Sequence, residues 1–268
     1  MQLERHVLHS FSFVMQIKST LDLRHEPLGR TLIIGDVHDS EKYRFLALCM
    51  AIQNGVLGDV DRIISMSDYG PDGFLNLVGN GKHRGCMPLF EDLGVPLYHV
   101  YGNHDEAWES YIRHDDLGKL REVNQTEDPR MKDNPKILEL IEEMKMKIKL
   151  DGVLVQHAPF HPFKPWPGRN AESLEYTHQY MQEMGFPTMM VGHIHENFVH
   201  DGEENMSSYI MSKEGEQTEA ISLGGTAHLV GVGRFNEKGN VAILENDHDG
   251  SPQVTFHKLW RDPSAYYS

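Results

Sequence analysis

Short clusters of His, Asp and Asn side chains recur along this sequence, and each cluster directly follows an apolar run. The densest cluster is Asn103, His104 and Asp105, which comes after the apolar stretch 95–101. Polar side chains packed this closely are costly in a protein core, where each would need a partner. At the end of a strand they are useful, because ligands bind there in α/β sheets. The clusters therefore indicate a functional site.

Matching groups follow four further apolar runs. In chain order, the candidate metal ligands are Asp36, His38, Asp68, Asn103, His157, His193 and His195. Side chains at positions i and i+2 of an extended chain point to the same side, so residues 36 and 38, or 193 and 195, can reach one ion. A helix N-cap would explain Asp39 or Ser40, but it would not explain Asp36 and His38. Asp68 on its own would also suit a turn.

The ligand types and their number indicate which ions they would hold. A mixture of imidazole and carboxylate suits Mn, Fe, Co, Ni or Zn better than Ca or Mg. Seven ligands exceed the needs of one ion and fit two divalent metal ions bridged by a carboxylate. Two-metal sites, with ions about 3.5–4 Å apart, generate a hydroxide nucleophile and stabilise the oxygens of an in-line displacement. That is the chemistry of phosphoester hydrolysis.

The elements that must position these side chains are strands predicted at 31–34, 62–66, 96–101, 151–156 and 187–191. Because ligands bind at the carboxyl ends of strands in α/β sheets, we expect the five strand ends to meet at one edge. Helices are predicted at 41–53, 74–78, 106–115, 136–149 and 170–184, with a loop at 122–135. After Phe198, short alternating runs separated by Gly-containing turns predict an antiparallel meander.

Composition limits the classes of function. The 268 residues are 39% hydrophobic, which suffices for a sizeable core, and carry a formal net charge of −15. This acidity argues against broad nucleic-acid binding, which needs a basic face. Cys49 and Cys86 form no disulfide framework, and neither a membrane-spanning run nor a secretory signal is evident. These features predict a cytoplasmic protein that does not enter a membrane.

The ordered motifs resemble those of the calcineurin-like metallophosphoesterases. The pieces are Gly35-Asp36-Val37-His38, Ser67-Asp68-Tyr69-Gly70, Gly102-Asn103-His104-Asp105, His157 and Gly192-His193-Ile194-His195, spanning about residues 31–200. Two features depart from parts of the family. Ser67 replaces the usual Gly of the second motif. No Asp-Arg-Gly follows it and the third motif ends in Asp105, so the chain resembles the phosphodiesterase and phosphatase group more than the Ser/Thr protein phosphatases.

The resemblance implies a fold and a role for each motif residue. It implies an α/β fold, a four-layer αββα sandwich whose second sheet takes in the C-terminal meander. Asp36, His38 and His195 would hold one metal, Asn103, His157 and His193 the other, and Asp68 would bridge them. His104 would contact the phosphate or protonate the leaving group, oriented by Asp105. We expect one domain over 1–268, with 106–150 as a cap or helical insertion.

The substrate is open at this stage. A small phosphoester, a nucleotide or a cyclic phosphodiester fits the acidic charge more easily than nucleic acid does. Candidate substrate contacts are Lys164, Arg169, His161 and Trp166 from a Pro-rich loop, and Arg113. The alternatives are a nuclease and a non-catalytic scaffold of the same fold, although no ligand is lost as a scaffold would predict. The oligomeric state does not follow from the sequence.

Overall fold

The computed structural model describes residues 18–201, 206–209, 211, 215–225, 227–236 and 238–260. These residues build two mixed β-sheets. The first has the strand order β1 (Thr20–Asp22), β5 (Lys147–Leu150), β6 (Val153–Gln156), β7 (Thr188–Val191), β11 (His228–Gly231), β8 (Phe198–His200) and β9 (Met206–Ser208). The second has the order β10 (Ile221–Ser222), β13 (Pro252–Lys258), β12 (Asn240–Asn246), β2 (Thr31–Ile34), β3 (Arg62–Ser65) and β4 (Leu97–His99).

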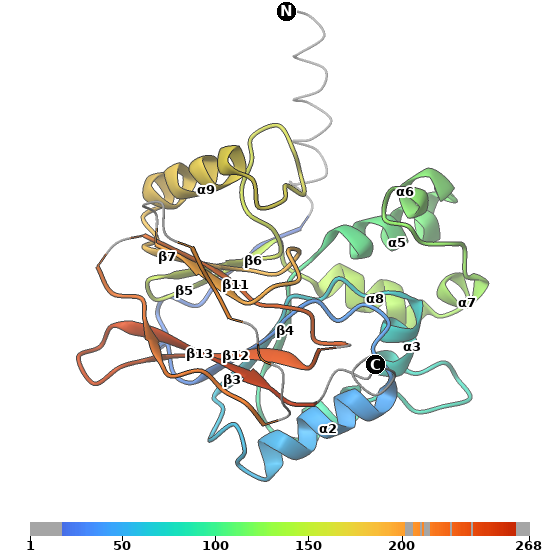
Figure 1. Cartoon of the computed structure of the whole chain (residues 1–268). Helices are drawn as coiled ribbons and strands as arrows, with labels where there is room; N and C mark the ends of the chain where they lie inside the picture. The colour runs from blue at the N-terminus through green and yellow to red at the C-terminus, as the bar shows by residue number, and fades with distance from the viewer. Residues whose placement is uncertain are drawn as a thin grey trace, which may run out of the picture.

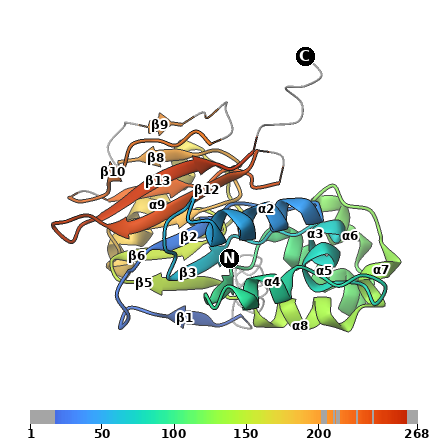
Figure 2. The same cartoon turned by 90° about the horizontal axis from the view of Figure 1, so that it is seen from below.

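Helices cover the outer faces of both sheets (Figures 1 and 2). The first sheet is covered by α9 (Ala171–Met184). The helices on the other side are α2 (Lys42–Gln53), α3 (Pro71–Val78), α4 (Met87–Asp92), α5 (Asn103–His114), α6 (Leu117–Glu122), α7 (Pro129–Lys132) and α8 (Pro135–Glu143). Among the helices that the structure describes, none combines the length and apolar composition needed to cross a lipid bilayer.

Three buried apolar clusters lie between the four layers. Ile33, Ile64 and Val155 belong to the cluster between the two sheets. Leu32 and Ile34 belong to the cluster beneath the helices, because neighbouring residues of a strand point to opposite faces. A third cluster joins the first sheet to α9. This arrangement confirms the predicted four-layer αββα sandwich.

The segment 106–150 contributes to the cluster beneath the helices. Trp108, Leu120 and Ile137 are buried there beside Leu32 and Phe45. The prediction that this segment caps the site, like that of a single domain over 1–268, stays a prediction.

The helix predicted over 136–149 is wrong in its second half. Helix α8 ends at Glu143, and residues 147–150 form strand β5, whose burial alternates along Lys-Ile-Lys-Leu. This period of two is the pattern of a half-buried strand. Gly152, at a φ of 68°, lies in the turn that joins β5 to its antiparallel partner β6. The hairpin turn and the sheet therefore override the helical spacing.

The C-terminal segments do not form the predicted meander within one sheet. Strand β11 lies between β7 and β8 in the first sheet, parallel to β7 and antiparallel to β8. Strands β12 and β13 pair in the second sheet, where β12 also pairs with β2. Strands do form there, but β11 and most of β12 are buried on both faces instead of alternating, and the chain divides the strands between the sheets.

Candidate functional site

The strand ends that bear the candidate ligands meet from both sheets, not from one. Asp36, Asp68 and Asn103 follow β2, β3 and β4 of the second sheet, while His157 and His193 follow β6 and β7 of the first. Backbone hydrogen bonds tie neighbouring loops together. The amide of residue 38 donates to the carbonyl of residue 68 at 3.0 Å, and that of 192 to 157 at 2.8 Å. The seven predicted ligands are thus brought together.

One group of ligands gathers around Asp36. Ligand atoms of Asp36, His38, Asp68 and His195 all lie within 4.8 Å of one another. The Nε2 atoms of His38 and His195 are 3.0 Å apart, and His195 Nε2 lies 3.1 Å from Asp36 Oδ2. Asp36 is completely buried, and its Oδ2 accepts no well-aligned hydrogen bond from a described residue. Because an unpaired buried carboxylate oxygen is costly, this atom suits a bound cation.

A second group gathers around Asn103 Oδ1. This oxygen lies 3.1 Å from His157 Nε2 and 2.9 Å from His193 Nδ1. His157 Nδ1 lies 3.0 Å from the carbonyl oxygen of Met66, so Nδ1 carries the proton and Nε2 presents a lone pair. Two acceptors as close as Nε2 and Asn103 Oδ1 favour a cation between them. The donor set therefore fits a second divalent ion.

Asp68 lies between the two groups. Its Oδ2 is 3.6 Å from His38 Nε2, and its Oδ1 is 3.5 Å from His157 Nε2. The side chain is 1% exposed, and Oδ1 also accepts the backbone N–H of His104 at 2.8 Å. Each carboxylate oxygen faces one ligand group, as a bridging ligand requires.

Burial lowers the pKa of two of the four candidate ligand histidines. It lowers the pKa of both His38 and His193 to about 4, against the opposing attraction of Asp68. Both rings are therefore neutral at physiological pH, the form in which imidazole binds metal. Burial also acts to lower the pKa of His157, but Asp68 and Asp36 outweigh it and raise that pKa.

Backbone strain is concentrated at this site. Among described residues other than glycine, seven have positive φ, and five of these are His38, Ser67, Asp68, His193 and His195. Such conformations are uncommon for residues with a Cβ and cluster where function demands them. Ser67, at a φ of 49°, holds a conformation that glycine would adopt without strain.

His104 lies beside Asp68 in the first turn of α5. Its side chain is 13% exposed, and its Nε2 lies 3.9 Å from Asp68 Oδ2. The ring meets that of His38 edge to face, with centroids 4.7 Å apart. Its Nδ1 is buried and has no hydrogen-bond partner among the described residues. Nε2 is therefore the nitrogen nearer to the ligand groups.

Asp105 does not hold the imidazole of His104, which corrects the orienting role predicted for it. Its Oδ2 accepts the backbone N–H groups of Asp68 at 3.0 Å and Gly102 at 2.8 Å, and its Oδ1 accepts that of Tyr69 at 3.0 Å. Burial and the nearby charge of Asp68 raise the pKa of Asp105 to about 7, while these amides oppose that shift. Asp105 thus fixes the loop that carries Asp68 against the start of α5.

Replacing Asp105 by Ala should destabilise the metal-free protein by about 3–5 kcal/mol, because three buried N–H groups lose their acceptor. Urea denaturation measures this, with Asp105→Asn as the milder variant that keeps one acceptor oxygen. Unchanged stability together with reduced turnover would favour the original role through His104.

Trp166 is the substrate-contact candidate that the structure brings to the ligands. Its ring lies edge to face with His157 at 5.5 Å and is 6.5 Å from the ring of His193. Its Nε1 donates to Glu106 Oε2 at 2.7 Å, and Lys119 Nζ lies 3.5 Å from the other oxygen of Glu106. The Pro-rich loop is thereby anchored to α5 beside the second ligand group.

Trp166→Ala should lower kcat/KM about 5- to 30-fold, because the packing of the ring and the hydrogen bond from Nε1 are both lost. The bound metal should not change. Steady-state kinetics with metal analysis would measure both. Trp260→Ala is the matched control, because Trp260 also donates from Nε1, to Asn236 O at 3.2 Å, but packs against Phe235. Equal losses in both variants would contradict a role at the site.

The remaining substrate-contact candidates from the Pro-rich loop contact other side chains of the protein. His161 packs edge to face on Tyr176, and both His161 and Lys164 lie 3.6 Å from Glu172. Arg169 pairs with Glu196 at 2.6 Å. These three remain predictions as substrate contacts.

Arg113 lies at the end of α5 opposite to the site, about 15 Å from Asn103 along the helix axis. It pairs there with Glu109 and Glu142 at 3.1 and 2.5 Å. The helix therefore carries Arg113 away from the ligands, and its predicted contact with substrate stays a prediction.

Two groups at the site escaped the sequence analysis. Glu106, which holds Trp166, sits in the first turn of a helix, where an acidic residue needs no other explanation than the helix dipole. The Met66 carbonyl that orients His157 is a backbone group and leaves no trace in residue type. The contacts of Glu106 with Trp166 and of the Met66 carbonyl with His157 are therefore visible only in the folded structure.

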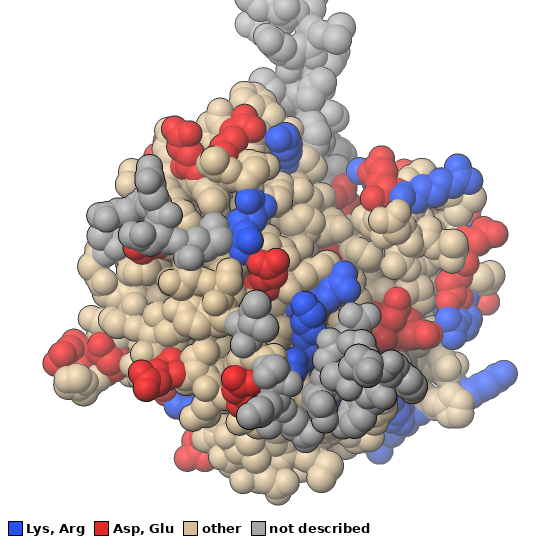
Figure 3. All heavy atoms as spheres, in the orientation of Figure 1, with Lys and Arg blue, Asp and Glu red and all other residues tan. Residues whose placement is uncertain are grey.

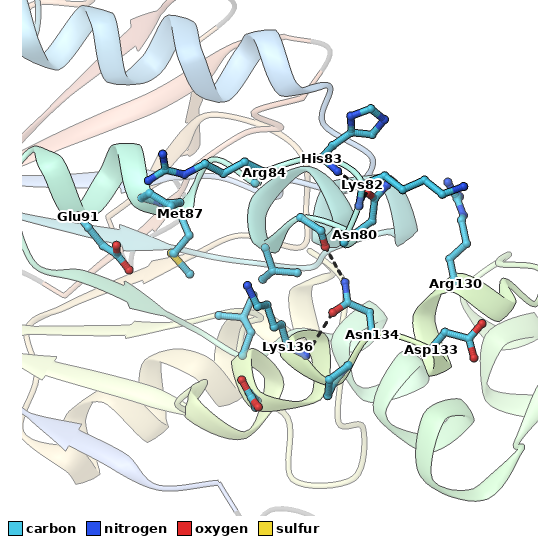
Figure 4. Close-up of a pocket in the computed structure, with 18 of the residues that line it drawn as sticks. Asn80, Lys82, His83, Arg84, Met87, Glu91, Arg130, Asp133, Asn134 and Lys136 are labelled. Atoms are coloured by element: carbon cyan, nitrogen blue, oxygen red, sulfur yellow. Dashed lines mark hydrogen bonds between the residues drawn. The ribbon is translucent and has the colours of Figure 1, made fainter.

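A larger cavity lies apart from these ligands, between the loop 79–85, α4 and α8 (Figure 4). Its volume is about 980 Å³, and no candidate ligand lines it. Asn80 Oδ1 shapes the loop by accepting the backbone N–H groups of Lys82 and His83 at 3.2 and 2.9 Å. Cations and carboxylates are mixed around it, with Arg84 and Lys136 beside Glu91 and Glu139.

Comparisons with known proteins agree with this geometry. Residues 29–197, more than half of the chain, match the sequence model of the calcineurin-like phosphoesterases. A metallophosphoesterase from Sphaerobacter thermophilus has a similar structure, with a TM-score of 0.55, 21% identity and coverage of 87% of this chain and 89% of that one. A hypothetical protein from Pyrococcus horikoshii is also similar in structure, with a TM-score of 0.50 and 11% identity. That likeness covers 88% of this chain and 91% of that one. These two likenesses show the fold.

No curated protein matches the sequence. The family match, and a group of buried ligands that could hold a metal ion, nevertheless suffice to classify the chain. It belongs to the calcineurin-like phosphoesterase family and is a metal-dependent phosphoester hydrolase.

Proposed function

We propose that the protein hydrolyses small phosphoesters with two divalent ions. Asp36, His38 and His195 would hold one ion, Asn103, His157 and His193 the other, and Asp68 both. The position of Asp68 carries this proposal, since its two oxygens face His38 and His157 at 3.6 and 3.5 Å. Mn, Fe, Ni, Co and Zn all suit this mixture of imidazole, amide and carboxylate.

The residues around the ions divide the chemical work. Bound divalent ions would supply a water of lowered pKa as nucleophile and positive charge beside the phosphoryl oxygens. His104 would donate a proton from Nε2 to the leaving oxygen. Asp105 would keep the loop of Asp68 in place, and Trp166 would exclude water from one side of the site. The reaction would be direct, with inversion at phosphorus and no phosphoryl-enzyme.

The test is hydrolysis of p-nitrophenyl phosphate and bis(p-nitrophenyl) phosphate by the full chain after loading with Mn. We expect turnover of at least one ester, lost on chelation and restored by metal. A protein that binds two equivalents of Mn yet cleaves neither these esters, nucleotides nor short nucleic acids would support the scaffold alternative.

A nuclease is less well supported. On the face shown in Figure 3, several Lys and Arg side chains lie near the centre, with Asp and Glu side chains among them and around the edge. The net charge of −15 also opposes the approach of a polyanion. A small substrate avoids most of this repulsion because it carries few charges.

A further inference from the structure

A second cavity, of about 280 Å³, opens directly beside His195. Described residues of three segments line it: the loop that carries His195, the end of β9 with Tyr209 and Met211, and the β12–β13 hairpin with Lys238 before it. His195 and Glu196 belong to its wall, so one ligand of the proposed metal centre also lines the cavity.

The ligand that lines this cavity is partly exposed, whereas three other ligands of the centre are buried. The side chain of His195 is 30% exposed, whereas those of Asp36, Asp68 and His157 are at most 1% exposed. A phosphoester can therefore reach the ions past His195, and the part of the substrate beyond the scissile phosphate can lie in the cavity.

The wall of the cavity carries positive charge. Lys238 and Lys258 both line it, and Lys238 forms no ion pair with any carboxylate that the structure describes. The negative charge of Glu196 is already neutralised, because Arg169 Nη1 lies 2.6 Å from its Oε2. In a protein with a net charge of −15, a lysine that pairs with no described carboxylate and lines a cavity beside the reaction centre favours an anionic occupant of that cavity.

Uncharged groups complete the wall. Tyr209 and Met211 offer apolar surface for the body of a small molecule. Asn197, which is 5% exposed, uses its Oδ1 to accept the N–H of Gly233 at 2.8 Å, which fixes the orientation of its amide in the wall. Pockets of this composition fix the orientation of a ligand through a few polar groups.

We infer that this cavity selects small phosphoesters that carry a second anionic group, a carboxylate or another phosphate, and that Lys238 binds that group. The inference rests on the proposed function for the scissile phosphate. It names Lys238 as a determinant of specificity outside the metal ligands.

The test compares two substrates of similar size, 3-phosphoglycerate and glycerol 3-phosphate, which differ by one carboxylate. The Mn-loaded wild type should prefer 3-phosphoglycerate by about 10- to 100-fold in kcat/KM, the value of one charge-assisted hydrogen bond. Lys238→Gln should abolish the preference, and Lys238→Glu should reverse it. Activity on glycerol 3-phosphate should change less than threefold in Lys238→Gln. Lys82→Gln, on the distant loop 79–85, is the matched control.

A binding measurement separates this inference from the proposed function. Calorimetry with the non-hydrolysable pair 3-phosphonopropionate and propylphosphonate should show tighter binding of the first to the wild type and equal binding to Lys238→Gln. If no ester is cleaved but this difference persists, the proposed function fails and the pocket assignment stands. The inference is overturned if wild type and Lys238→Gln bind both phosphonates alike. It is also overturned if Lys238→Gln loses activity toward both esters by the same factor.

Discussion

Replacing Asp68 by Asn should lower kcat/KM about 10²- to 10³-fold and reduce the bound metal below two equivalents per chain. In the wild type, Asp68 Oδ1 accepts the backbone N–H of His104 at 2.8 Å. Asparagine retains an oxygen that can accept this N–H, so the start of α5 should remain in place. What disappears is the negative charge that faces both ligand groups. The change should therefore act on metal binding and turnover more than on stability.

Steady-state kinetics with p-nitrophenyl phosphate and elemental analysis of the same sample test this expectation. Asp61→Asn is a suitable control, because Asp61 Oδ2 also accepts a distant backbone N–H, that of Arg30 at 2.7 Å, away from the site. Full activity with two bound ions in Asp68→Asn would refute the bridging assignment. Equal loss of stability in both variants, without a difference in metal, would also count against it.

The ligand set was predictable because it follows from strand ends and residue types. Asp36 and His38 come after a run of four apolar or β-branched residues, and His193 and His195 come after another. Such side chains have few structural explanations at these positions, since a buried pair of imidazoles is costly without partners. The order of these motifs along the chain was then enough to show the resemblance to the family.

The pairing of the strands was not predictable in the same way. Strand β11 enters the first sheet between β7 and β8, although the chain later returns to the second sheet with β12. β11 and β12 are buried over most of their length, and a short buried run does not specify which strand pairs with it. The convergence of two sheets on one site therefore emerges only in three dimensions.

Asp105 shows a second reason for failure. A carboxylate next to a histidine in sequence suggests that one orients the other, yet successive side chains of a helix do not face each other. Asp105 turns instead toward the amides of Asp68, Tyr69 and Gly102. Arg113 shows a related difficulty, because its charge is visible in the sequence but its distance from the ligands along α5 is not.

His104→Ala should lower kcat about 10²- to 10⁴-fold for an alkyl phosphate such as glycerol 3-phosphate, and much less for p-nitrophenyl phosphate. An alkoxide leaves poorly without a proton, whereas p-nitrophenolate needs none. Metal content should stay unchanged, because His104 Nε2 approaches Asp68 Oδ2 only to 3.9 Å and the ring is outside both ligand groups. The ratio of the two losses is the informative quantity.

That ratio distinguishes the two roles that the position of His104 allows. If His104 only binds the phosphoryl oxygens, removal of its ring should reduce turnover of both esters by the same factor. If it donates the proton from Nε2, the loss should grow with the pKa of the leaving alcohol across a series of esters. His83→Ala, an exposed histidine on the loop 79–85, controls for loss of an imidazole elsewhere. A loss independent of the leaving group would exclude proton donation while leaving the metal assignment intact.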